Sequence, residues 1–316
     1  MSHNAIREAL VVGAGIIGLT SAIRLQMAGW RVRVWTADDP LDTASATAAA
    51  LWYPYRIYPE DRVRAWSASG FDHFLSEAND GTGVRLVAGT LLWRGARPPS
   101  TRDIRDVREL IAADVPVGYA GGCVVQLPVI EMPLYLPHLA SRVLENGGTI
   151  ERSRITSLDD ACAAARVVVN ASGLGARALC GDESVTPIRG QVVRVRNPGL
   201  TRFVVDIDAP HGATYIIPRS ADCVLGGTAD EGSWNSVPDA NTAERIMARC
   251  AVLEPALRTV QVLEHRVGLR PGRPAVRLEA QSFGASTVIH NYGHGGAGVT
   301  VAWGCAAEVV REAGLL

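Results

Sequence analysis

Residues 9–18 read ALVVGAGIIG, and after a helix-like run and Gly29 the chain continues as RVRVW over residues 31–35. Apolar residues lead into the spacing Gly-x-Gly-x-x-Gly, formed by Gly13, Gly15 and Gly18. This order predicts a strand, a glycine turn, a helix and a second strand, which is the context that a dinucleotide-binding fingerprint requires. Gly13 permits the tight turn, Gly15 lets the backbone approach a pyrophosphate, and Gly18 lets helix and strand pack closely. The alternative is a tight strand-to-helix turn in another kind of α/β domain.

Length, composition and charge narrow the kinds of protein that this chain can be. The chain has 316 residues, of which 47% are hydrophobic, and its formal net charge is -1. That length predicts one large domain or two intimate ones, and the charge gives no attraction toward nucleic acid or an anionic membrane. No apolar run is long enough to span a membrane, and residues 1–4 lead straight into the first strand without a signal peptide. We therefore expect a cytoplasmic protein whose six scattered cysteines are reduced.

The chain contains no lysine, since all 31 basic residues are arginine. A pyridoxal enzyme needs a lysine for its Schiff base, and a P-loop needs one for its phosphates, so both chemistries are excluded. The hydrolase signatures Gly-x-Ser-x-Gly and His-Glu-x-x-His are also absent. No Cys-x-x-Cys pair occurs, and we expect no metal site.

The end of the second strand lacks the acidic residue that holds the adenosine ribose in nicotinamide-binding domains. Thr36 and Ala37 occupy the strand end, and Asp38 follows in a predicted loop, which weakens an NAD interpretation. The small, hydroxyl-rich stretch from Thr43 to Thr47 suits close approach to a phosphate, or is an ordinary polar loop. Residues 48–55, AAALWYPY, either form the wall of an apolar pocket or fill a domain junction.

Farther along, the pattern interleaves two kinds of structure. Units typical of the nucleotide-binding domain recur at 9–36, 138–175 and 287–313, with sheet-like segments between them. The apolar run 167–169 predicts a central parallel strand beside the first strand. Helices are predicted over residues 60–80, 133–145, 240–258 and 299–313.

A second glycine cluster, GHGGAG at 293–298, precedes the last of these helices. Bare backbone and a helix N-terminus favour partial negative charge, and the spacing suits a flavin pyrimidine ring better than a second dinucleotide. The alternative is a plain glycine-rich turn. His290 and His294 do not share a helical face, so a metal pair is disfavoured. Arg270, at a strand end before Pro271, either clamps a carboxylate or is solvated.

Five motifs now stand in order along the chain: GAGIIG (13–18), AAALWYPY (48–55), YIIP (215–218), GLRP (268–271) and HNYGHGGAG (290–298). Together they resemble the D-amino-acid oxidase family, and the resemblance spans residues 11–304. It implies an α/β fold in which a Rossmann-like FAD-binding domain is interleaved with a mixed-sheet α+β substrate-binding domain. The expected FAD-binding parts are 1–56, 133–182 and 265–316, and the expected substrate-binding parts are 57–132 and 183–264.

The resemblance also implies residue roles. Arg270 would hold the substrate carboxylate, the Tyr215 hydroxyl would hydrogen-bond the same group, and the backbone carbonyl of Gly296 would accept from the amino group. The implied side-chain pocket is Tyr53, Tyr55, His211 and Ile217. The implied FAD contacts are Gly13, Ala14, Gly15, Ile16, Ile17, Gly18, Thr36, Ala37, Thr43, Ser45, Ala49, Ala50, Leu51, Ile155, Ser172, Gly173, Gly293, Gly295, Gly296, Ala297, Gly298, Val299 and Thr300.

The implied reaction is oxidative deamination of a D-amino acid, with hydride transfer from Cα to flavin N5 and 2-oxo acid, ammonia and H2O2 as products. The expected partners are the D-amino acid and O2, with no nucleic acid or membrane, and the sequence leaves open whether the chain is a homodimer. Tyr53 and Tyr55 favour neutral or apolar substrate side chains. D-aspartate oxidase is an alternative, with Arg56, Arg202, Arg219 and His211 as candidate extra cations, and so is a dehydrogenase that uses another electron acceptor. His211 stands where vertebrate members of the family carry a lid tyrosine, and the segment 206–210 before it is short.

Overall fold

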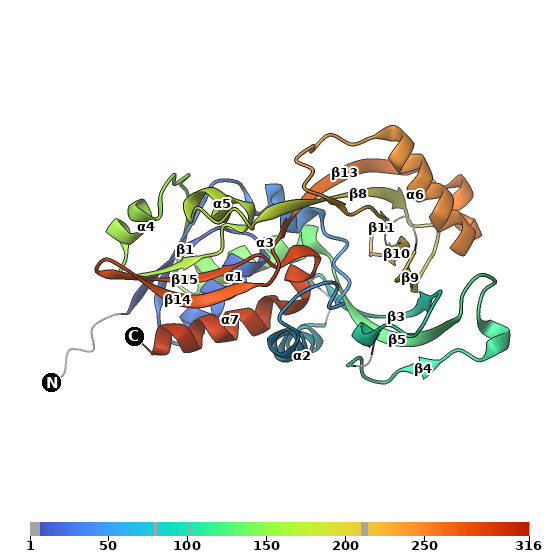
Figure 1. The fold of residues 1–316 in the computed structure, drawn as a ribbon, viewed down its shortest axis with the longest axis horizontal. Coiled ribbons are helices and arrows are strands. Elements are labelled where there is room, and N and C mark those ends of the chain that lie inside the picture. Colours follow the sequence, from blue (N-terminus) through green and yellow to red (C-terminus); the bar gives the residue numbers. More distant parts are fainter. Residues whose placement is uncertain (1–6, 79–80, 102, 210–213, 316) are drawn as a thin grey trace.

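The computed structural model describes residues 7–78, 81–101, 103–209 and 214–315. Two sheets organise these residues, and they lie side by side along the long axis of the molecule (Figure 1). One sheet has six strands and the other has nine. The expected α/β class with a second, mixed sheet is confirmed.

The first sheet is the parallel sheet of a nucleotide-binding domain. Its strands in spatial order are β14 (Arg277–Phe283), β15 (Ser286–Tyr292), β7 (Val167–Asn170), β1 (Glu8–Val12), β2 (Arg31–Thr36) and β6 (Thr149–Arg152). β14 alone is antiparallel to its neighbour. Val11 of β1 pairs with Val34 of β2 on one side and with Val169 of β7 on the other. The prediction that residues 167–169 run beside the first strand is confirmed.

Helices cover both faces of this sheet, as a buried parallel sheet requires. Successive residues of β1 point to opposite faces, so Val11 joins the large core under α1 while Leu10 packs with Leu158 and Ala161 of α4. The α-helices of the whole described chain, of which α6 packs on the second sheet, are α1 (Ile16–Met27), α2 (Glu60–Ser76), α3 (Met132–Glu145), α4 (Leu158–Ala164), α5 (Ala176–Leu179), α6 (Ala240–Leu253) and α7 (Gly298–Gly314). No helix in the described ranges is both long enough and apolar enough to cross a membrane.

The second sheet is mostly antiparallel. Its strands in spatial order are β12 (Asp230–Glu231), β8 (Thr186–Arg196), β11 (Asp222–Gly226), β10 (Thr214–Pro218), β9 (Phe203–Asp206), β3 (Val84–Trp93), β5 (Gly121–Ile130) and β4 (Arg108–Glu109), with β13 (Val262–Gly272) also paired to β8. Only β3 and β9 run parallel. Apolar residues of β8, β10 and β11 pack against Ile246 and Cys250 of α6, forming a separate small core.

The short 3-10 helices connect these elements. They are η1 (Pro40–Asp42), η2 (Ala44–Thr47), η3 (Pro99–Thr101), η4 (Ala112–Asp114), η5 (Gly173–Gly175), η6 (Pro255–Thr259) and η7 (Gly295–Ala297). The predicted helix 240–258 stops at Leu253, because Pro255 disfavours helical geometry at the residue before it. The chain then tightens into η6.

The chain passes directly from one sheet to the other. The long strand β13 pairs with β8 of the second sheet along its whole length, and then leads through a short turn into β14 of the first sheet (Figure 1). Helix α2 packs against α7 of the first domain, although residues 57–132 were expected in the other. The division of the chain by residue range stays a prediction.

Candidate cofactor and substrate site

A cavity of about 930 Å³ extends from the first sheet to the second. On one side it is lined by the segments that follow β1, β2, β7 and β15, all at the carboxyl ends of parallel strands. Ligands of open α/β sheets bind at this edge. On the other side it is lined by residues of β8, β9, β10 and β13.

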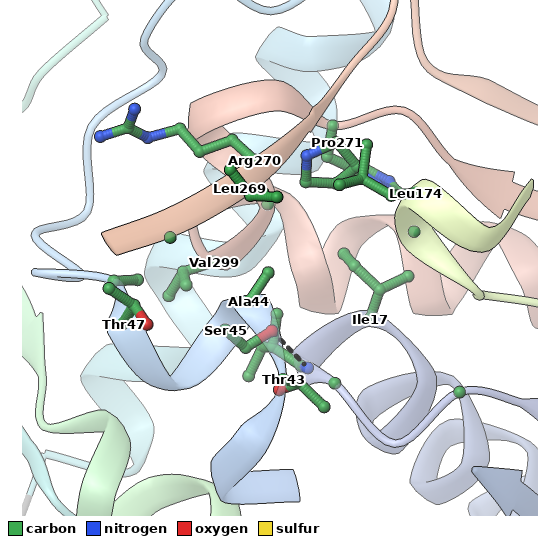
Figure 2. A pocket seen from close by; sticks show the side chains of 18 of the residues that line it. Ile17, Thr43, Ala44, Ser45, Thr47, Leu174, Leu269, Arg270, Pro271 and Val299 are labelled. Carbon is green, nitrogen blue, oxygen red and sulfur yellow. Dashed lines mark hydrogen bonds between the residues drawn. The ribbon is translucent and has the colours of Figure 1, made fainter. Parts of the chain in front are cut away.

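The first glycine motif forms one wall of the cavity. Gly13 has φ +111°, and a Cβ there would meet the carbonyl oxygen of Ala171 at 2.5 Å. At Gly15, a Cβ would point toward Ser45 Oγ at 3.0 Å, inside the cavity. Ser45 Oγ accepts from the backbone N–H of Ile16 at 3.1 Å, the contact drawn in Figure 2. α1 begins after Gly15 with no side-chain cap, so its N-terminus suits a phosphate anion.

Gly18 has a packing role instead. A Cβ on Gly18 would overlap the carbonyl oxygen of Gly13, in the turn before α1, and Gly18 does not line the cavity. Gly293 and Ala297 are also not among the lining residues, although both were predicted to contact FAD. A Cβ on Gly293 would meet the side chain of Arg273 at 2.8 Å, and Ala297 is buried in the small core that includes Ile57 and Val63.

All the other predicted FAD-contact positions line the cavity. Sequence reasoning missed two charged residues at the end of the cavity near β2 and β6. Asp38, placed in a loop and set aside, lines the cavity and pairs with Arg154 at 3.1 Å. Arg154 follows β6, whose neighbour is β2. Nothing local in the sequence relates these two residues, because parallel pairing of β2 and β6 brings their loops together.

Arg270 lies at the opposite end of the cavity, on β13. Its guanidinium lies over Gly190 of β8, where any Cβ would overlap it. Arg270 Nη1 donates to the carbonyl oxygen of Thr228 at 3.1 Å. No carboxylate in the described part of the chain pairs with Arg270, whereas the nearby Arg273 pairs with Asp182. The side chain extends along the cavity wall, away from the Ser45 contact (Figure 2).

Tyr215 accompanies Arg270 at this end. The ring lies over Gly226 of the neighbouring strand β11, where a Cβ would overlap it. Burial raises the pKa of the Tyr215 hydroxyl, and the positive charge of Arg270 opposes that shift. The phenol is therefore a neutral hydrogen-bond donor beside an unpaired cation, which is a suitable environment for a carboxylate.

The remaining wall at this end is apolar and aromatic. The predicted Tyr53, Tyr55 and Ile217 line it, joined by Val205 and Ile207. His211 lies outside the described residues. The charged residues that line the cavity elsewhere in the described chain, Asp38, Asp42 and Arg154, follow β2 and β6 in sequence.

Tyr53 is fixed at both ends. Its backbone N–H donates to Thr300 Oγ1 at 3.1 Å, and its carbonyl oxygen accepts from the same hydroxyl at 3.0 Å. Its phenol hydrogen-bonds to Ser100 Oγ of η3. Burial raises the pKa of Tyr53 to about 12, against the effect of that hydrogen bond. The ring therefore forms a rigid, neutral wall.

The Gly295–Gly298 loop closes the cavity next to Arg270. Gly295 has φ +53°, and a Cβ on Gly296 would lie 3.4 Å from the ring of Tyr55 and 3.5 Å from Arg270 Cδ. η7 and α7 begin here without side-chain caps. The structure thus brings Gly296, Arg270 and Tyr55 into contact distance.

A family model described as FAD dependent oxidoreductase matches residues 8–312. The chain belongs to this family. It is 51% identical over 319 residues to a D-amino-acid oxidase of Rubrobacter xylanophilus, covering 99% of this chain and 98% of the relative. It is 45% identical over 320 residues to a D-amino-acid oxidase of Streptomyces coelicolor, covering 97% and 96%. A glycine oxidase structure from Geobacillus kaustophilus has the same fold, with TM-score 0.81, 19% identity and coverage of 98% and 95%.

FAD is the cofactor of the family, and the residues present fit it. The N-terminus of α1, whose N-cap residue Gly15 has no side chain, and the Cβ-free space at Gly15 suit the pyrophosphate. Half-exposed apolar residues such as Ile17, Leu174 and Leu269 line the cavity, where a cofactor would cover them (Figure 2). The second uncapped glycine loop, at the other end, suits the flavin ring.

Proposed function

We propose that the chain is an FAD-dependent oxidase of D-amino acids, with a preference for neutral or apolar side chains. The observation that carries the proposal is the unpaired Arg270 guanidinium beside Tyr215, at the apolar end of a cavity that suits FAD. D-amino acids as the substrate class come from the two relatives.

In this proposal Arg270 and the Tyr215 hydroxyl bind the substrate carboxylate, and the carbonyl oxygen of Gly296 accepts from the amino group. Three fixed contacts orient the Cα–H bond toward the flavin, and such orientation lowers the barrier without a proton-transfer group. When bound, FAD would supply the hydride acceptor, its N5, and a route for the electrons to O2 that gives H2O2.

Among the described residues, no carboxylate lines the cavity at this end. The polar groups of the described residues near Arg270 are phenols, hydroxyls, backbone amides and the imidazole of His294. Burial lowers the pKa of His294 to about 3, so it is too weak a base to take a proton from an ammonium group. The substrate amine therefore gives its proton to solvent on binding, and the enzyme acts by selecting the neutral amine. The apolar wall of Tyr53, Tyr55 and Ile217 then excludes water from the reacting centre.

The preference for neutral substrates is supported by the positions of the candidate cations. A D-aspartate oxidase needs a second cation for the side-chain carboxylate. Arg219 is buried in an ion pair with Asp222 at 2.6 Å, and neither Arg56 nor Arg202 is among the described residues that line the cavity. We therefore expect kcat/KM for D-alanine and D-methionine to exceed that for D-aspartate by at least about tenfold. The reverse order would favour the D-aspartate oxidase alternative.

Peroxide yield separates an oxidase from a dehydrogenase with another acceptor. The proposal predicts one H2O2 per substrate consumed in air. A yield near zero, with rapid turnover on a quinone or dye, would contradict it. The proposed location is the cytoplasm, supported by six cysteines that are all free thiols.

A further inference from the structure

His294 lies in the middle of the second glycine motif and has no assigned role. The side chain is 3% exposed, and the residue lines the cavity. His290, four residues earlier, is equally buried but does not line the cavity. The two histidines of the motif therefore have different surroundings.

The hydrogen bonds of His294 fix its tautomer. Nε2 lies 3.1 Å from Asn291 Oδ1, which can only accept, so Nε2 carries the proton. Asn291 Nδ2 in turn donates to Ser21 Oγ at 3.2 Å, and Ser21 Oγ donates to the carbonyl oxygen of Ile17 at 2.7 Å. These buried groups form one chain of hydrogen bonds that runs from the glycine loop to the first turns of α1.

The other ring nitrogen, Nδ1, is left with a lone pair. No residue in the described part of the chain donates to it. Burial lowers the pKa of His294 to about 3, so the ring is neutral and Nδ1 remains an acceptor at physiological pH. Nδ1 is not among the buried polar atoms without a partner, so this acceptor is open to the cavity that His294 borders. In contrast, both ring nitrogens of His290 are paired, with Gln281 and with Asn170.

The ligand group that meets this nitrogen must be a donor. His294 precedes the loop expected to hold the flavin ring, and its hydrogen-bond chain ends at α1, whose N-terminus suits the pyrophosphate. The part of FAD between ring and pyrophosphate is the ribityl chain, which carries hydroxyl donors. FAD has other donors: the ribose hydroxyls and the adenine amino group at its adenosine end, and N3–H on the flavin ring. Asp38 and Arg154 mark a different part of the cavity for the adenosine end. The hydrogen bonds that connect His294 to α1 place it toward the pyrophosphate and away from the flavin N3–H.

We propose that His294 is a cofactor-binding residue whose Nδ1 accepts a hydrogen bond from a ribityl hydroxyl of FAD, with Asn291 and Ser21 holding the imidazole in the required tautomer. The inference rests on FAD as the cofactor and not on the identity of the amino-acid substrate. A test that measures FAD binding to apoprotein therefore separates its failure from failure of the proposed substrate.

The test combines variants with cofactor analogues. Kd is measured by fluorescence titration of apoprotein with FAD, with FAD carrying a 2′-, 3′- or 4′-deoxyribityl chain, and with FAD carrying 2′-deoxyadenosine. His294→Leu is expected to weaken FAD binding about tenfold, the order of one lost hydrogen bond with its buried partner. The wild type is expected to bind one of the deoxyribityl analogues about tenfold more weakly than it binds FAD. His294→Leu is expected to bind that analogue and FAD with the same Kd. His290→Gln, the matched control, is expected to keep the wild-type Kd.

Three results would overturn the proposal. The first is a wild-type Kd for His294→Leu. The second is a loss of affinity from His294→Leu that adds to the loss of affinity caused by each of the deoxyribityl analogues. The third is that the losses of affinity from His294→Leu and from the 2′-deoxyadenosine analogue, and from no other analogue, fail to add, which would assign the hydrogen bond to the ribose.

If His294→Leu does not fold, as judged by circular dichroism, ¹⁵N-histidine NMR of the wild type replaces it. The unprotonated Nδ1 resonance of His294 is expected to move when FAD is added and to stay in place with the relevant deoxyribityl analogue. A protonated Nδ1, or an Nδ1 resonance that FAD does not move, would contradict the proposal.

Discussion

At the scale of single residues, the proposed carboxylate site depends on the positive charge of Arg270 and on the absence of a carboxylate partner among the described residues. Its guanidinium makes one hydrogen bond to a backbone carbonyl and has no carboxylate partner in the described part of the chain. Charge-assisted hydrogen bonds to a bound carboxylate are worth roughly 1.5–3 kcal/mol each. We therefore assign Arg270 the largest share of substrate binding.

Replacing Arg270 tests that assignment. Arg270→Ala removes the cation and leaves the carboxylate facing an apolar wall, so kcat/KM for D-alanine is expected to fall by about 10³-fold or more. FAD stays bound, because Arg270 is remote from the contacts at α1. Steady-state kinetics together with the flavin absorption of the purified variant checks both parts. Near wild-type kcat/KM would show that another group binds the carboxylate.

The proposed binding side chains Arg270 and Tyr215 lie over glycines, where any larger residue would displace them. Gly190→Ala places a Cβ in the space of the Arg270 guanidinium. The guanidinium must move, and misplacement of a positioning group costs about 10²-fold in rate. The expected result is a fall in kcat/KM of that order without loss of FAD.

Gly95→Ala is the control for this substitution, because a Cβ there has only Asp208 Oδ2 nearby, at 4.0 Å. It should retain wild-type kinetics. Equal activities of Gly190→Ala and the wild type would mean that the orientation of Arg270 over Gly190 does not matter for turnover.

These glycines could not be found from the sequence. Gly190 and Gly226 belong to no motif, and their role follows from the registers that set Arg270 beside β8 and Tyr215 opposite Gly226. Strand register between distant segments has no local signal. In contrast, the turn at Gly13 and the loop at 293–298 were predictable, because the spacing of glycines before a helix is a local sequence pattern that indicates a ligand-binding turn.

At the scale of elements, α2 and α7 cross where both carry small residues. A Cβ on Gly304 of α7 would overlap the backbone of Trp66, and a Cβ on Gly70 of α2 would overlap the carbonyl of Thr300. Thr300 also binds the backbone of Tyr53. The closeness of this crossing therefore supports one wall of the cavity.

Gly304→Ala is expected to destabilise the protein by about 1–3 kcal/mol through overpacking. Gly314→Ala is the matched control, since Gly314 ends the same helix and a Cβ there has nothing within 4 Å. Its thermal midpoint should equal or exceed that of the wild type. Thermal unfolding of both variants is the measurement, and an unchanged midpoint for Gly304→Ala would contradict the close crossing.

Glu77, just after α2, connects three helices. It pairs with Arg142 of α3 and accepts from the Tyr135 hydroxyl at 2.5 Å, and Tyr135 accepts from Trp303 of α7 at 2.9 Å. Burial alone would raise the pKa of Glu77. Hydrogen bonds from His73 and Tyr135, with the charges of His73 and Arg142, outweigh it and hold the pKa at about 2.

Because this pKa is lower in the folded than in the unfolded chain, the carboxylate stabilises the fold above the ordinary glutamate pKa. The contribution is lost as pH falls from there toward 2. Glu77→Gln is therefore expected to cost about 2–3 kcal/mol at pH 7, and the difference from wild type should shrink below about pH 4. Urea unfolding at several pH values measures this, and a pH-independent difference would contradict the assignment.

At the scale of the whole molecule, the two ends of the chain form opposite ends of one cavity. β1 and α1 border the end proposed for the pyrophosphate, and the loop before α7 lies at the far end with Arg270 and Tyr215 from the second sheet. The order of motifs predicted this interleaving, because nucleotide-binding units recur at the start, middle and end of the chain. The meeting of Asp38 with Arg154 was not predictable, since it depends on the packing of β2 against β6.

The central claim is that this cavity holds FAD and a D-amino acid in reacting contact. Anaerobic addition of D-alanine to the purified holoenzyme tests it most directly. We predict that the flavin band near ~450 nm, a property of the oxidised cofactor, bleaches within the mixing time of a manual experiment, and that L-alanine leaves it unchanged. A band that D-amino acids with neutral side chains do not bleach, or that both enantiomers bleach equally, would contradict the account.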